Sequence, residues 1–146
     1  IYTDGSCGTE GKRKGIGTWC YVIVKDGKKI AEARNLKEKT TSAEMEYLAV
    51  YYALKAAKRM DLKEFTVCSD YKAIVDKMSI AKLIKRNRDG SIIDDGPNRD
   101  LLNKLVLYTD TMDAVVHWEW IRGHSGNRWN VYCDNLAKTL MRKASA

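Results

Sequence analysis

The chain has 146 residues, of which 45% are hydrophobic and 31% charged, and it contains a single proline. This length and composition are typical of one globular domain with a hydrophobic core, and no apolar run reaches the roughly 18 residues that a membrane span needs. The formal net charge of +7 favours a polyanionic partner, nucleic acid first, although an inert basic surface would give the same sum.

The first part of the chain predicts three strands. They cover residues 1–7, 18–25 and about 28–36. Residues 18–25 are rich in Val, Ile, Tyr and Trp, and an Asp-Gly pair between the last two strands is a hairpin turn signal. The loop over residues 8–17 holds four glycines and four charged residues. We therefore expect a sheet that begins with a hairpin.

The rest of the chain alternates helices with strands. The predicted elements are a helix over 43–60, a strand over 64–69, helices over about 71–86 and 98–112, a strand over 114–121 and a helix over 131–144. The polar segment 87–97 is expected to be an exposed loop or projection, and Trp118 and Trp120 are expected to belong to the core. The order βββαβααβα predicts an α/β fold with a mixed sheet covered by helices, formed as a single domain over residues 1–146.

The four cysteines indicate neither a zinc site nor a disulfide scaffold. Cys7, Cys20, Cys68 and Cys133 contain no Cys-x-x-Cys pair, and a chain of this length can build a core without cross-links. We expect four reduced, mostly buried thiols in an intracellular, reducing compartment. Because Ile1 lies inside a predicted strand, we expect the native start, with any targeting segment, to lie upstream.

Four acidic residues stand in, or at the end of, segments that otherwise form a core: Asp4, Glu46, Asp70 and Asp134. Burying an unpaired carboxylate is costly, so four such cases suggest one shared compensation, a divalent metal. Each also has a local explanation. Asp4 precedes a glycine and could mark a turn, Asp70 could cap a helix, and Glu46 and Asp134 could be first-turn charges favoured by the helix dipole.

Helical spacing separates Glu46 from its neighbour Glu44. Glu46 heads a stripe of small apolar residues at helical intervals, namely Ala49, Val50, Ala53 and Ala57. Glu44 falls on the opposite side and is expected to be a solvated or first-turn charge. A group of carboxylates without a histidine or cysteine cluster is a hard-oxygen site, which suits Mg²⁺ or Mn²⁺ rather than zinc.

An ordered set of short motifs adds to these observations. It comprises Asp4-Gly5-Ser6 after a strand, Met45-Glu46 on a helix after Thr-Thr-Ser, Ser69-Asp70 at a strand end, the run Trp-Glu-Trp-Ile-Arg-Gly-His-Ser-Gly over 118–126, and Cys133-Asp134-Asn135-Leu136-Ala137. Together these motifs closely resemble the type 1 ribonuclease H family over essentially the whole chain. The resemblance implies an RNase H-like fold, with a five-stranded mixed sheet, its first three strands antiparallel, and helices on both faces.

The same resemblance implies an endoribonuclease that hydrolyses the RNA strand of RNA–DNA hybrids and leaves 5′-phosphate and 3′-hydroxyl ends. It implies a two-metal-ion mechanism with Mg²⁺, for which Mn²⁺ could substitute. The partner would be the hybrid, with no membrane involved. The unit would act as a monomer, either as a free-standing enzyme or as the RNase H domain of a larger polypeptide such as a reverse transcriptase.

The resemblance also assigns roles by position. Asp4, Glu46, Asp70 and Asp134 would be the catalytic, metal-binding carboxylates, and His124 would be the mobile-loop histidine that assists proton transfer or product release. The implied substrate-binding residues are Gly5, Ser6, Thr41, Ser42, Lys82, Lys85, Arg86, Arg88 and Asn130.

Three regions depart from the commoner pattern of that family. The first loop lacks the usual Asn-Pro and has Gly-Thr-Glu-Gly-Lys-Arg-Lys-Gly over residues 8–15. Ser42 and Ala43 stand where two Asn or Gln residues often precede the catalytic glutamate. The basic projection over 82–100 is diluted by three aspartates, Asp89, Asp94 and Asp95, which predicts a weakened handle for the DNA strand.

Two other functions fit the sequence less well. One is a non-catalytic module that binds hybrids or RNA on the same fold, and the intact carboxylates argue against it because a pure binder has no need of them. The other is a different metal-dependent nuclease or strand-transfer enzyme with a related fold. The histidine loop and the closing Asp-x-Leu-Ala helix argue against that second alternative.

Overall fold

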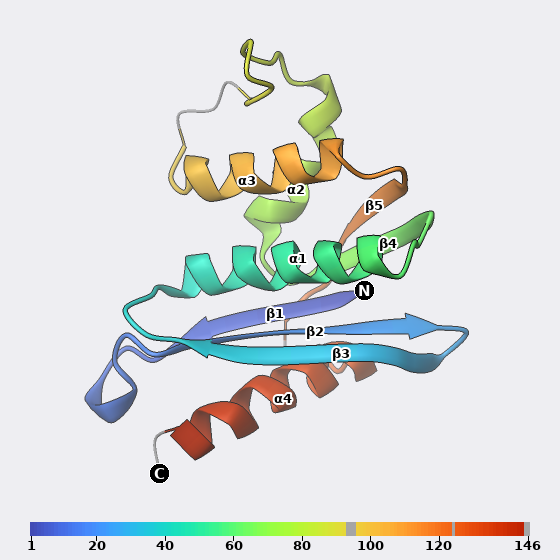
Figure 1. Ribbon diagram of the computed structural model, residues 1–146. Coiled ribbons are helices and arrows are strands. Elements are labelled where there is room, and N and C mark those ends of the chain that lie inside the picture. The colour runs from blue at the N-terminus through green and yellow to red at the C-terminus, as the bar shows by residue number, and fades with distance from the viewer. Residues whose placement is uncertain (93–95, 124, 145–146) are drawn as a thin grey trace.

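Figure 1 shows the computed structural model, which describes residues 1–92, 96–123 and 125–144. The elements in chain order are β1 (Tyr2–Cys7), a short 3-10 helix η1 (Gly11–Arg13), β2 (Gly17–Lys25), β3 (Lys28–Lys37), α1 (Ser42–Arg59), β4 (Glu64–Ser69), α2 (Lys72–Ile80), a second 3-10 turn η2 (Ala81–Leu83), α3 (Arg99–Asp110), β5 (Val115–Trp120) and α4 (Arg128–Ala144). The strands and α-helices follow the predicted order. His124, Asp94 and Asp95 lie outside the described residues.

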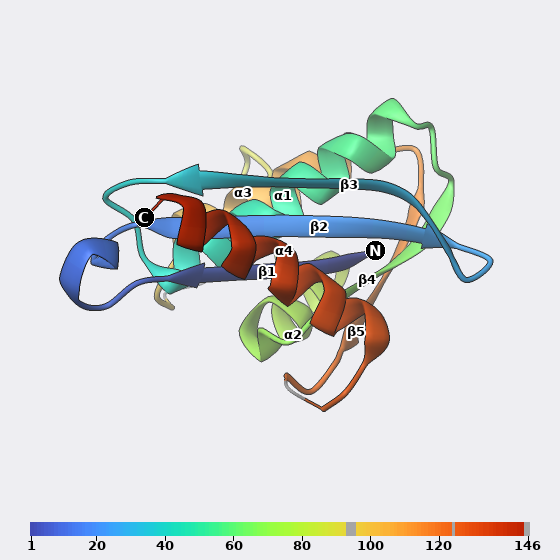
Figure 2. The same ribbon diagram turned by 90° about the horizontal axis from the view of Figure 1, so that it is seen from below.

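The five strands form one mixed sheet in the order β3-β2-β1-β4-β5. β1 pairs antiparallel with β2, and β2 with β3, whereas β4 pairs parallel with both β1 and β5. α1 packs on one face, over β1 and β2, with α3 beside it, and α4 crosses the opposite face (Figure 1 and Figure 2). The arrangement confirms the predicted five-stranded sheet with helices on both faces. None of the helices in the described ranges is long and apolar enough to cross a membrane.

The core lies mainly on the α1 side of the sheet. β2 is buried on both faces, because α1 covers one face of the sheet and α4 the other. Successive side chains of the strand point to opposite sides. Trp19, Tyr21 and Ile23 pack toward α1, whereas Cys20 and Val22 pack toward α4. The stripe of small residues predicted on α1 is buried against the sheet, which sets how closely α1 approaches β1.

Two cysteines are joined, and the expectation of four reduced thiols is therefore wrong. Cys20 on β2 and Cys133 on α4 form a disulfide, with their Cα atoms 6.1 Å apart. Cys7 and Cys68 are free, as expected. The pairing is invisible in the sequence because 113 residues separate the two cysteines, and only the docking of α4 on β2 brings them together.

α4 begins at Arg128, three residues before the predicted start. The side-chain oxygen of Asn127 accepts hydrogen bonds from the backbone N–H groups of Trp129 and Asn130, both at 3.1 Å. Asn is among the preferred residues for capping a helix in this way. Asn127 is therefore a readable start signal, and the added turn brings Asn130 into the helix.

α2 ends at Ile80, six residues before the predicted end, and the backbone becomes extended at Ile84 after the η2 turn. The guanidinium of Arg86 folds back and donates to the carbonyl of Ala81 at 3.3 Å. This contact gives a helix-end carbonyl a partner that the helix itself no longer supplies. The helix therefore ends earlier than predicted, and the residues after η2 belong to the segment that precedes α3.

Candidate active site

Three of the predicted carboxylates meet at one point of the sheet. Asp4 comes from the middle of β1, Glu46 from the beginning of α1, and Asp70 from the residue after β4. One oxygen of each lies within 4.8 Å of the others. Asp4 and Glu46 are each 8% exposed, and Asp70 is half-buried. The parallel pairing of β1 with β4 and the packing of α1 across β1 bring the three together.

Gly5 fixes the position of Glu46. Its backbone N–H donates to Glu46 Oε1 at 2.5 Å. A Cβ at residue 5 would lie 2.3 Å from the carbonyl carbon of Met45 and 2.5 Å from the backbone nitrogen of Glu46, so only glycine allows α1 this close. Gly5 continues β1 and pairs with Trp19, so the Asp-Gly pair at this position is part of a strand and not a turn.

The start of α1 separates the two glutamates as predicted. Thr41 caps the helix, because its side-chain oxygen accepts from the backbone N–H of Glu44 at 3.1 Å. Glu44 points away from the carboxylate group and binds Lys37 Nζ at 2.6 Å and the Thr40 hydroxyl. Glu46 is turned inward. Thr41, predicted to bind substrate, thus has a structural role as the helix cap.

Asp70 is not the cap of α2. The capping position belongs to Tyr71, and no side chain caps that helix end. Asp70 instead lines the same cavity as Asp4 and Glu46. This removes the local explanation for Asp70 and leaves its place among the carboxylates as the reason for an acidic residue there.

Burial and mutual repulsion make two of these groups reluctant to ionise. Removal from water raises the pKa of Asp4 to about 7, with the negative charges of Asp70 and Asp134 adding to the effect. The pKa of Glu46 is raised well above its usual value, first by burial and then by the charges of Asp4 and Asp70. A bound cation would offset the repulsion among these carboxylates and favour their ionised forms.

Asp134 joins the site from the other face of the sheet. It lies on α4 and lines the same cavity of about 320 Å³ as Asp4, Glu46 and Asp70. Its carboxylate is bound by Lys138 Nζ at 2.8 Å, one helical turn further along α4. Asp134 thus combines contact with the acidic cluster on one side and with a basic side chain on the other.

Four of the residues predicted to bind substrate border this cavity. They are Gly5, Ser6, Ser42 and Asn130. Ala43 borders it as well, so both positions that depart from the family's commoner pattern face the site. Of the predicted basic handle, Lys82, Lys85 and Arg88 are exposed to solvent.

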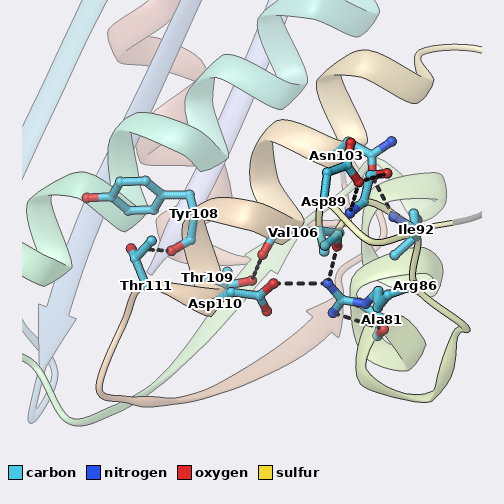
Figure 3. A network of polar contacts seen from close by, with 12 residues as sticks. Ala81, Arg86, Asp89, Ile92, Asn103, Val106, Tyr108, Thr109, Asp110 and Thr111 are labelled. Carbon is cyan, nitrogen blue, oxygen red and sulfur yellow. Dashed lines mark hydrogen bonds and ion pairs between the residues drawn. The ribbon is translucent and has the colours of Figure 1, made fainter.

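Arg86, also predicted to bind the substrate, is engaged within the protein (Figure 3). One guanidinium nitrogen donates to the Gly90 carbonyl at 2.7 Å and to Asp110 Oδ2 at 3.0 Å, and another reaches the Ala81 carbonyl at 3.3 Å. These bonds tie the first residue of η2, the loop at Gly90 and the end of α3 to one side chain.

The same segment is held a second time by Asp89 (Figure 3). Its carboxylate accepts from the backbone N–H of Ser91 at 2.9 Å and from the Ser91 hydroxyl at 2.6 Å. The backbone N–H of Ile92 donates to Asn103 on α3 at 2.8 Å, and the Ile92 side chain is buried. Asp89 therefore shapes the loop, in addition to lowering the local positive charge.

Trp120 is a residue at the site whose role the sequence does not indicate. Its alternation with Trp118 predicts a core position, but its side chain is 45% exposed at the end of the edge strand β5. Its indole N–H donates to the Asp70 carbonyl at 3.2 Å. Trp118, on the same strand, packs against the main core as expected. The two tryptophans differ in their place along β5, because Trp120 is the last residue of the strand.

Residues 1–142 match the family model described as RNase H. The chain belongs to the RNase H family. A protein named Ribonuclease H from Treponema denticola is 34% identical, with 98% of this chain and 96% of the relative covered. Another of that name from Orientia tsutsugamushi is 36% identical, with 94% of this chain and 78% of the relative covered.

Solved structures carry the same RNase H fold. LC11-RNase H1, solved in complex with an RNA/DNA hybrid, superposes with a TM-score of 0.76 at 20% identity and covers 99% of this chain and 97% of that one. The N-terminal RNase H domain of a Mycobacterium tuberculosis protein gives a TM-score of 0.71 at 20% identity, covering 99% and 94% of the two chains. The resemblance first drawn from the motifs is thereby confirmed at the level of family and fold.

Proposed function

We propose that the protein is an endoribonuclease that hydrolyses the RNA strand of RNA–DNA hybrids and leaves 5′-phosphate and 3′-hydroxyl ends. The observation that carries the proposal is the meeting of Asp4, Glu46 and Asp70 within 4.8 Å of one another in a largely buried setting. Membership of the RNase H family supports it, as does the likeness to an RNase H1 solved with a hybrid.

The residues present fit divalent cations. The cluster offers carboxylate oxygens from three chain segments, with Asp134 adjoining, and oxygen-only donors of this kind suit Mg²⁺, with Mn²⁺ as a substitute. Burial raises the pKa values of Asp4 and Glu46, and the neighbouring carboxylate charges raise them further, so bound cations would favour the ionised ligands. We propose that the four carboxylates hold two Mg²⁺ ions, which would supply an activated water and neutralise charge on the phosphate.

The protein's own groups hold these ligands in place. The Gly5 N–H orients Glu46, the Trp120 indole anchors the backbone of Asp70, and Lys138 holds Asp134. Such supporting contacts fix ligand orientation and usually affect metal affinity strongly. His124, which the resemblance places beside the site, is proposed to assist proton transfer or product release.

Selectivity for a hybrid requires contacts that distinguish ribose from deoxyribose. The 2′-hydroxyl both donates and accepts hydrogen bonds, so it needs polar partners close to the scissile phosphate. Ser6, Ser42 and Asn130 offer such groups at the cavity wall. We propose that these three contact the RNA strand, and that Lys82, Lys85 and Arg88 contact the DNA strand.

A cleavage assay tests the function directly. The protein is incubated with end-labelled RNA–DNA hybrid, duplex DNA and duplex RNA, each with and without Mg²⁺, and only the RNA of the hybrid should be cut. Cleavage of duplex DNA would support the related nuclease, and binding without any cleavage would support the binding module.

The variant Asp70→Asn should bind hybrid without cutting it. Removal of a supporting residue typically costs 10–100-fold, so removal of a direct ligand should lower the cleavage rate by at least about 100-fold. Asp76→Asn, an exposed residue on α2, is the matched control and should cleave like the parent protein. Equal activity of the Asp70 variant and its control would contradict the assignment.

A further inference from the structure

A second cavity, of about 390 Å³, adjoins the carboxylate site. It lies between the loop that follows β1 and the last turns of α4, which reach the same end of the sheet (Figure 1 and Figure 2). Ser6 lines both cavities, so the two lie next to each other on the protein surface. We call the second cavity the basic pocket, because Arg13, Lys138 and Arg142 form its charged lining.

The basic residues of α4 extend directly from the acidic site. Asp134, Lys138 and Arg142 are spaced four residues apart and therefore share one face of the helix. From Asp134 to Arg142 this face covers about 12 Å, at 1.5 Å per residue. Lys138 lies at the boundary, because it binds Asp134 at 2.8 Å and also lines the basic pocket.

The loop that carries Arg13 is held by its own backbone. The Gly8 N–H donates to the Ile16 carbonyl at 3.0 Å, and the Gly15 N–H donates to the Gly8 carbonyl at 3.1 Å. A Cβ on Gly8 would lie 2.2 Å from the Arg13 carbonyl oxygen, so the loop closes tightly on a glycine. The backbone that carries Arg13 opposite the end of α4 is therefore held in one conformation. Less conformational entropy of the loop is then lost when a ligand binds.

We propose that the basic pocket binds a backbone phosphate of the RNA strand, a few nucleotides from the phosphate held at the carboxylates. The inference rests on the proposed function and adds a substrate contact to it. Two guanidinium groups and an ammonium suit a phosphodiester, since arginine can bind its two free oxygens in a bidentate manner. The cleaved strand is the one at the carboxylates, so the same strand continues into the adjoining cavity.

The decisive experiment measures how the neutralisation of each single phosphate affects hybrid binding, with and without the basic residues of the pocket. Hybrids are prepared with one phosphate at a time replaced by an uncharged methylphosphonate, at successive positions of either strand. Binding is measured in the Asp70→Asn background, which prevents cleavage. We expect one RNA-strand position at which neutralisation weakens binding roughly tenfold, the size of one charged hydrogen-bonded contact.

The double variant Arg13→Ala/Arg142→Ala should lose that sensitivity and bind the unmodified hybrid roughly tenfold more weakly. The slope of log affinity against log salt should decrease by about 0.9, because one phosphate is no longer neutralised by the protein. Lys25→Ala/Lys28→Ala is the matched control, because it removes the same charge from exposed residues at the tip of the β2–β3 hairpin. Arg13→Lys/Arg142→Lys keeps the charge and should retain part of the binding.

The outcomes separate the pocket from the function itself. If the parent protein cuts hybrids but the double variant shows unchanged affinity and unchanged sensitivity at every RNA position, the pocket proposal is overturned. Coupling to a DNA-strand phosphate would overturn it as well. In steady-state cleavage we expect KM to rise with kcat nearly unchanged, which marks a binding contact. Failure of the parent protein to cut hybrids would count against the proposed function, while the binding experiment would still test the pocket.

Discussion

At the scale of single residues, the energetic cost of the site lies in two carboxyl groups that β1 and α1 hold in the interior. Asp4 and Glu46 are almost fully buried, and neither gains from ionising in the metal-free protein. A shift of one pKa unit corresponds to about 1.36 kcal/mol between the two protonation states. The cost of the metal-free site therefore appears when these two groups ionise, because burial and the neighbouring carboxylates disfavour their charged forms.

The free energy of unfolding of the metal-free protein should fall as pH rises from about 5 to 8. The pKa of Asp4 is about 7 in the folded state, against 3.8 ordinarily, and that of Glu46 is also raised, so the folded state binds more protons across this window. The loss should amount to a few kcal/mol. Urea unfolding in EDTA at several pH values measures it. Glu44, whose pKa is lowered by Lys37, acts only at more acidic pH.

Two controls assign this pH dependence to the carboxylates. Asp4→Asn removes one ionisation and should flatten the profile while abolishing cleavage. Addition of Mg²⁺ at pH 8 should restore stability to the unsubstituted protein and have less effect on the variant. A metal-free protein that became more stable between pH 5 and 8 would show that the acidic cluster does not dominate its titration.

At the scale of elements, the charged residues between α2 and α3 have a different role from the one that their composition indicates. Its charges suggest a surface that binds nucleic acid, yet Arg86 and Asp89 use their hydrogen bonds on the protein backbone, on Ser91 and on Asp110. Most of these partners are close in the sequence, but Asp110 lies 24 residues from Arg86, and no local sequence pattern indicates that contact. The basic side chains of the predicted handle that remain exposed to solvent are Lys82, Lys85 and Arg88.

Arg86→Ala should therefore act on stability more than on binding. Removal of the hydrogen bonds from a charged donor to Gly90, Ala81 and Asp110 should cost about 1–3 kcal/mol, with faster amide exchange at Ile92. Lys85→Ala is the paired control: it should leave stability within about 0.5 kcal/mol and weaken hybrid binding instead. The opposite pattern, weaker binding and unchanged stability for the Arg86 variant, would reinstate Arg86 as a substrate contact.

Over the whole molecule, the sequence predicted the order of the elements, the mixed sheet and the meeting of Asp4, Glu46 and Asp70. These follow from alternation, helical spacing and motif order, all of which are local or ordered along the chain. It missed the cross-link of Cys20 to Cys133, because that pair depends on the register of α4 over β2. It also misplaced Trp120, because the alternation that Trp120 shares with Trp118 does not show that Trp120 is the last residue of β5, where its side chain is exposed.

The charge on the exposed part of the projection should govern long-range attraction of the hybrid. Reversing three charges in Lys82→Glu/Lys85→Glu/Arg88→Glu should lower the slope of log affinity against log salt by about 0.9 for each phosphate that the protein no longer neutralises. Lys25→Glu/Lys28→Glu, at the hairpin tip, provides a charge-reversed control. An unchanged slope in the triple variant would mean that this projection takes no part in binding.

α4 follows every other element of the chain and brings Asp134 to the site. During synthesis, β1 to β5 leave the ribosome before α4 does. At that stage the chain contains Asp4, Glu46 and Asp70, but it lacks both the fourth carboxylate and the helix that covers Cys20 and Val22. Docking of α4 closes the exposed face of the sheet and completes the acidic cluster in the same event. A chain that lacks α4 therefore lacks both the apolar cover of this face and the fourth carboxylate of the cavity.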